Sequence, residues 1–175
     1  MKKLVIMCIL LLTPLMAQAE EPYTPNNPPK TIEFNLAQAK YFYDVAGGCT
    51  YLYTLQYKHA AMANLLDNSQ TSADWMKNAK EQSDTWLTLA QIMEGILEKG
   101  FDLPSIQTQE YKMNQYHNLN IFFSELFMTS IPQQYFQRVL NSTSYCVMNQ
   151  NGITSFIDLS IEKIKSSPDK PKKRM

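Results

Sequence analysis

The chain has 175 residues, of which 18% are charged, and its 16 Lys and Arg residues balance 16 Asp and Glu residues. This length fits one domain with one core. The charge balance gives no general attraction to nucleic acid or to anionic lipid. We therefore expect a single globular domain that is not a nucleic-acid-binding protein.

Residues 1–19 have the pattern of a secretory signal peptide. Lys2 and Lys3 form its positive start, a short apolar run follows, and Ala17-Gln18-Ala19 matches the small-x-small cleavage site. The apolar run is too short for a stable transmembrane helix, although an uncleaved membrane anchor is the alternative interpretation. We predict cleavage near Ala19 and a periplasmic or secreted protein of a bacterial envelope, with no stable membrane span after cleavage. The loss of two lysines leaves 14 basic against 16 acidic residues, a net charge near −2.

Residues 20–33 are predicted to form a Pro-rich extended arm, because their four prolines disfavour a helix. From about Phe34 the spacing of apolar residues by three and four predicts a first helix, on the stripe Phe42, Val45, Cys49, Leu52 and Leu55. Gly47-Gly48 interrupts this helix, which predicts either a kink or a close helix crossing. A turn is expected over residues 65–72, with Ser72 as the N-cap of the next helix.

The second predicted helix is the clearest, because its apolar stripe ends at Lys99-Gly100, a cation followed by a C-cap glycine. That stripe consists of Trp75, Ala79, Trp86, Leu89, Met93 and Ile96. A third helix is predicted from Leu103-Pro104-Ser105 to about Met128. Its expected stripe is Ile106, Met113, Tyr116, Phe123 and Phe127.

Ser130-Ile131-Pro132-Gln133 resembles a capping box with proline in the first turn and predicts the start of a fourth helix. Asn151-Gly152 is expected to end this helix, and a fifth is predicted from Ile153 to about Lys165. Residues 166–175 are predicted to be a basic tail without fixed structure, with a partner-binding or surface-binding arm as the alternative. The expected fold is thus an all-α bundle of four to five helices in residues 34–165.

Two cysteines, Cys49 and Cys146, remain once Cys8 leaves with the leader. An oxidising compartment lets such a pair persist as a disulfide, and neither a C-x-x-C nor a C-x-x-C-H motif is present. We predict a structural disulfide between the first and fourth helices. A soft-metal thiolate pair and two buried thiols are the alternatives.

No motif for catalysis or for a cofactor appears in the chain: it lacks G-x-S-x-G, H-E-x-x-H and glycine-rich phosphate loops. His59 and His117 stand alone on separate predicted helices, and the methionines are spread along the chain as core fillers are. We therefore predict no catalytic residues, no metal and no cofactor. An enzyme with a dispersed site around the histidines, or a ligand or metal carrier, is the alternative.

Tyrosines crowd the first predicted helix, and a helix cannot bury all of its circumference against one neighbour. Exposed tyrosine is common at protein interfaces, so we predict a candidate interface made of Tyr41, Tyr43, Tyr51, Tyr53 and Tyr57. The alternative is that other helices cover this segment on several sides. The predicted function is a non-enzymatic helical binding protein whose partner is another envelope protein. A toxin-immunity protein or inhibitor, or an accessory subunit of an envelope or secretion assembly, fits this description.

Overall fold

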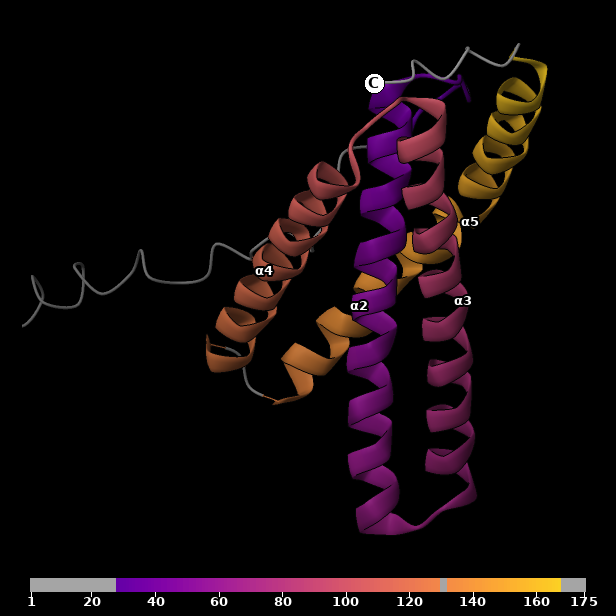
Figure 1. The fold of residues 1–175 in the computed structure, drawn as a ribbon. Coiled ribbons are helices and arrows are strands. Elements are labelled where there is room, and N and C mark those ends of the chain that lie inside the picture. The colour runs from indigo at the N-terminus through magenta and orange to yellow at the C-terminus, as the bar shows by residue number, and fades with distance from the viewer. Residues whose placement is uncertain (1–27, 130–131, 168–175) are drawn as a thin grey trace, which may run out of the picture.

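The computed structural model describes residues 28–129 and 132–167, which form four long helices and, within these ranges, no strand. Helices α2 (Leu36–Asp67) and α3 (Gln70–Gly100) make a long antiparallel hairpin. Helix α4 (Ser105–Thr129) leans against one side of this hairpin, and α5 (Pro132–Ser166) passes behind it (Figure 1). The all-α prediction is confirmed. The predicted leader, most of the arm and most of the basic tail lie outside the described residues.

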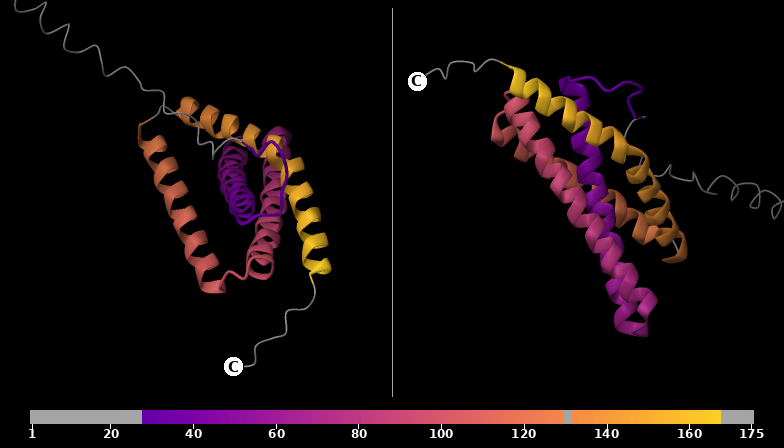
Figure 2. Two further views of the ribbon diagram at one scale, coloured as in Figure 1. Left: turned by 90° about the horizontal axis from the view of Figure 1, so that it is seen from above. Right: turned by 90° about the vertical axis from the view of Figure 1, so that its right-hand side faces the viewer.

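Helix α2 is the central helix of the bundle. Seen from above, it lies between the other three helices (Figure 2), and it contacts each of them. Its buried residues consequently surround much of its circumference instead of following one stripe; they include Ala39, Phe42, Tyr43, Val45, Ala46, Cys49 and Leu52. None of the described helices is both long and apolar enough to cross a membrane.

The turn between α2 and α3 forms where the sequence predicts it, but its capping residue differs. Asn68 closes α2 in the left-handed conformation, with φ of 46°. Ser69, not Ser72, is the N-cap of α3, because its hydroxyl accepts a hydrogen bond from the backbone N–H of Ser72 at 3.1 Å. The Ser72 side chain is buried and donates to Asp67 at 2.7 Å. The prediction of Ser72 as N-cap was therefore wrong by one turn of helix.

Gly47 lies at a close helix crossing, and α2 runs through Gly47-Gly48 without interruption. A Cβ atom on Gly47 would collide with the side-chain amide of Gln115 from α4. That amide nitrogen donates to the backbone oxygen of Asp44 at 2.6 Å. Of the two alternatives that the glycine pair left open, the structure has the close crossing.

The predicted fourth and fifth helices are one continuous helix, α5, which changes direction along its length (Figure 2). Gly152 does not end a helix: a Cβ atom there would lie 3.2 Å from the Phe42 ring of α2. The glycine thus provides space for an aromatic ring between two helices. The prediction of a helix end at Asn151-Gly152 was wrong because sequence alone does not distinguish a glycine at a crossing from a C-cap glycine.

The disulfide is formed as predicted and joins α2 to α5. Cys49 and Cys146 are 1% and 0% exposed, with a Cα–Cα distance of 5.7 Å. The core around them is built from large side chains of all four helices, including Phe42, Trp86, Met93, Leu97, Leu119, Phe123, Val139, Ile153 and Phe156.

The face that α4 turns toward the bundle differs from the predicted stripe. Thr108, Gln115, Leu119 and Phe123 are buried, whereas Ile106, Met113 and Phe127 are exposed. Polar side chains occupy the inner face because they find partners there: Gln115 bonds to α2, and Thr108 bonds to Glu98 of α3 at 3.2 Å. Much of the apolar pattern of α4 therefore faces outward.

Candidate protein-binding groove

The five tyrosines singled out on α2 point in several directions. Tyr43 is 2% exposed and packs against the ring of Tyr111, at a centroid distance of 5.7 Å. Tyr41 is half-buried against α5, where its hydroxyl hydrogen bonds to Tyr145 at 2.6 Å and to Asn149 at 2.9 Å. These two rings serve the packing between helices.

Of the remaining three, Tyr57 faces α3 and Tyr51 faces α4, while Tyr53 is half-buried. Tyr57 lines a shallow depression with Lys80 and Asp84 of α3. The five tyrosines therefore do not form one patch, because residues on a central helix project toward different neighbours. Tyr51 is the member that borders an open groove.

This groove, which we call the aromatic groove, lies between α2, α4 and the start of α5 and has a volume of about 350 Å³. The ring of Tyr51 stacks on Phe123 at 5.6 Å, and its hydroxyl donates to Asn120 at 3.2 Å. On the other side, Phe127 meets the ring of Tyr135 edge to face at 5.2 Å. The residues that line it are Tyr51, Leu55, Lys58, Asn120, Phe123, Ser124, Phe127, Met128 and Tyr135.

The aromatic groove combines fixed walls with exposed apolar rims. Phe123 and Tyr135 are 2% and 5% exposed, so their positions are set by the core. Phe127 and Met128 are 59% and 83% exposed. Buried aromatic rings beside accessible apolar side chains give the groove surface against which an apolar group could be buried.

Lys58 supplies positive charge at the edge of the aromatic groove. Its side chain is exposed, and it forms no ion pair within the described ranges. Burial raises the pKa values of Tyr51 and Tyr135 above the usual value, so both hydroxyls stay protonated at neutral pH. At that pH the groove presents apolar surface, neutral hydroxyl and amide groups, and one cation.

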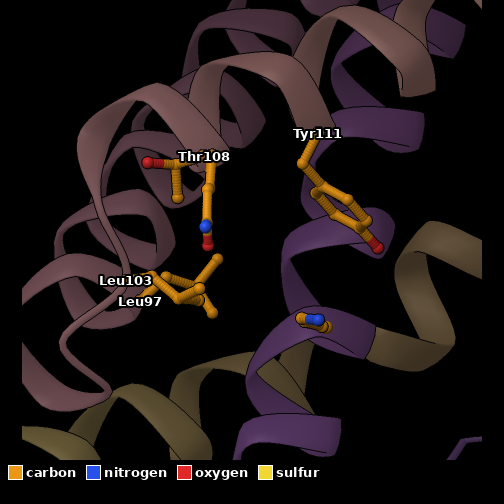
Figure 3. Close-up of a pocket in the computed structure, with 6 residues that line it drawn as sticks. Leu97, Leu103, Thr108 and Tyr111 are labelled. Carbon is orange, nitrogen blue, oxygen red and sulfur yellow. The ribbon is translucent and has the colours of Figure 1, made fainter.

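A second, smaller cavity lies between α2, α3 and α4, with a volume of about 80 Å³ (Figure 3). It is lined by Lys40, Leu97, Leu103, Gln107, Thr108 and Tyr111. Tyr111 donates to the carboxylate of Asp44 at 2.5 Å, and burial raises the pKa of Asp44, an effect that Tyr111 and Lys40 partly offset. Since a water molecule takes up about 30 Å³ of the liquid, this cavity has room for roughly two or three of them.

The two histidines occupy different environments. His59 packs edge-on against the rings of Tyr135 and Phe136, and burial lowers its pKa below the usual value. His117 is exposed on α4. Neither histidine is hydrogen bonded to or ion-paired with a carboxylate in the part of the chain that the structure describes. No group of three or more His, Cys, Asp or Glu side chains in that part is placed to bind a metal ion.

Sequence reasoning missed most of the groove residues. Phe123 and Phe127 were predicted as members of the core stripe of the third helix, and neither Tyr135 nor Lys58 was singled out. The five apolar residues of the third predicted helix fit one stripe, so the sequence carries no signal that Phe127 is exposed while Phe123 is buried. Compared with known proteins, the chain matches no family model, no curated protein sequence and no solved structure.

Proposed function

We propose that this chain is an exported, non-enzymatic helical binding protein that holds a partner protein in the aromatic groove. The single observation that carries the proposal is the groove itself, in which buried Phe123 and Tyr135 fix the walls and exposed Phe127 and Met128 form the rim. The Cys49–Cys146 disulfide supports an exported protein, since such bonds persist in oxidising compartments such as the bacterial periplasm. Cleavage of the leader near Ala19 would deliver it there.

The chemistry of the groove defines the partner. An aliphatic or aromatic side chain held in the groove would contact Tyr51 and Phe127, and a carboxylate beside it would pair with Lys58. We therefore propose a partner segment that presents a large apolar residue next to Asp or Glu. Inhibition of an exported toxin, or attachment to an envelope or secretion assembly, are roles in which a partner protein is held in this way.

The test uses the full-length gene with its own leader, expressed in its native host. A photo-crosslinking amino acid replaces Phe127 in one variant and Lys77, on the exposed face of α3, in a control variant. The proposal expects a crosslinked protein from position 127 and none from position 77. Mass spectrometry of the exported protein is expected to find Glu20 as the first residue and no free thiol.

Binding of the crosslinked partner is then measured with purified proteins. Phe127→Ala and Lys58→Glu are each expected to weaken binding tenfold or more, because truncated anchors and reversed charges at a groove have effects of that size. Lys77→Glu, a charge reversal outside the groove, is the matched control and is expected to bind as the wild type does. Wild-type affinity in both groove variants would refute the proposal.

A further inference from the structure

Helix α4 carries a second apolar face that none of the other three described helices covers. Ile106, Met113, Ile121 and Met128 are 66%, 72%, 42% and 83% exposed. At 100° per residue they lie within a narrow sector of the helix surface, opposite the buried side chains of Thr108, Gln115 and Leu119. The inner face of α4 packs on α2 and α3, and within residues 28–129 and 132–167 no helix packs on this outer face.

The outer face follows a regular and symmetric pattern. Its residues are spaced by four, three, four, four, three and four positions, and we call them the outer stripe: Ile106, Glu110, Met113, His117, Ile121, Ser124 and Met128. Spacings of three and four produce a continuous seam along a helix. The pattern reads the same in both directions from His117, with apolar residues at matching distances on either side.

We infer that the outer stripe is the contact between two copies of this chain, with their α4 helices antiparallel and a two-fold axis at His117. A two-fold interface must be complementary to itself, and this pattern is. Ile106 of one copy then meets Met128 of the other, and Met113 meets Ile121. Charges are compatible as well, because Glu110 meets the neutral Ser124, and Glu125 on the flank meets the neutral Gln107.

The size of the stripe sets the strength of the contact. From Ile106 to Met128 it runs about 33 Å, at 1.5 Å per residue. With a width of roughly 10 Å it provides about 330 Å² per copy, which is below the area of a standard stable interface. The inference is therefore a weak, reversible dimer. It is independent of the proposed function, although Ser124 and Met128 belong to both the outer stripe and the aromatic groove.

Site-directed crosslinking tests the antiparallel register. Because the native cysteines form a disulfide, an introduced cysteine is the one expected free thiol of the exported protein. His117→Cys lies on the two-fold axis and is expected to form a disulfide-linked dimer under mild oxidation. Met113→Cys alone is expected to stay monomeric, whereas a mixture of Met113→Cys and Ile121→Cys forms dimers. Lys77→Cys, on α3 and away from the outer stripe, is the control for disulfide-linked dimers that form by random collision.

Sedimentation of the oxidised protein from about 5 to 300 µM provides the second readout. The wild type is expected to shift from monomer to dimer, and Met113→Glu to remain monomeric with an unchanged circular dichroism spectrum. A wild type that stays monomeric throughout, or crosslinks of Met113→Cys with itself that equal those of His117→Cys, would overturn the inference. Tyr51→Ala, in the aromatic groove but off the outer stripe, is expected to dimerise normally even if it loses partner binding.

Discussion

Removal of the Cys49–Cys146 bond is expected to lower the free energy of unfolding by about 3–5 kcal/mol. The bond closes a loop of 97 positions between α2 and α5. The loss of chain entropy in the unfolded state for a loop of about 100 residues corresponds to roughly 4.7 kcal/mol at 25 °C, which is the upper value. In a domain of this size a loss of 4 kcal/mol lowers the melting temperature by roughly 8–16 °C.

The assay is urea denaturation followed by circular dichroism at 222 nm, with and without a phosphine reductant. The Cys49→Ala/Cys146→Ala double variant reports the same loss without reductant and adds the packing contribution of two buried sulfur atoms. The wild type in reductant and the double variant are expected to retain the four-helix spectrum at low urea. A difference below about 1 kcal/mol between oxidised and reduced protein would refute the reasoning, because the bond would then not constrain the unfolded chain.

Three further predictions concern single side chains. Gly47→Ala is expected to lower the free energy of unfolding by about 1–3 kcal/mol, because the new Cβ displaces Gln115 from its hydrogen bond. Gly95→Ala has no atom within 4 Å of its new Cβ and is expected to raise the free energy of unfolding by up to about 1 kcal/mol, as parallel urea titrations would show. Asp44→Asn is expected to be more stable than the wild type at pH 7 and equal to it near pH 3, because the raised pKa of Asp44 means that folding opposes ionisation of its carboxyl. Melting temperatures of both proteins between pH 3 and pH 7 test the direction of this difference. Burial lowers the pKa of His59, so the wild type is expected to reach its full stability above pH 6.5 and to lose stability as the pH falls below that value. His59→Gln is expected to show a flatter stability profile in the same pH titration, and an identical profile would exclude His59 as the cause.

The helical class and the positions of most helix ends could be predicted from local sequence. Apolar residues at three-and-four spacing, Pro104 before α4, the proline at the start of α5 and Asn68-Ser69 between α2 and α3 act through backbone geometry, which depends on neighbours in the chain. The disulfide was predicted from the expected export of the protein and from the two cysteines expected to remain after cleavage of the leader. These features need no knowledge of the tertiary packing.

The glycines and the outer face of α4 could not be predicted, because their meaning depends on which helices meet. Asn151-Gly152 is a sequence typical of a helix end, yet Gly152 lies inside α5 and leaves space for the Phe42 ring of α2. Ile106 and Met113 fit a core stripe, yet Thr108 and Gln115 occupy the inner face because their hydrogen-bond partners lie on other helices. A periodic pattern identifies a helix without identifying the side that its neighbours cover.

By itself, the sequence determined an all-α chain and its approximate helix boundaries, since both depend on local conformation. The Cys49–Cys146 pairing was a prediction that rested on the expected loss of Cys8, and the structure confirms it. The tertiary structure alone decided that α2 is central, that its tyrosines face three different helices, and that Tyr51, Phe127 and Tyr135 enclose one groove. The physical reason is that side chains from positions 51, 127 and 135 become neighbours only after α4 and α5 have packed against α2.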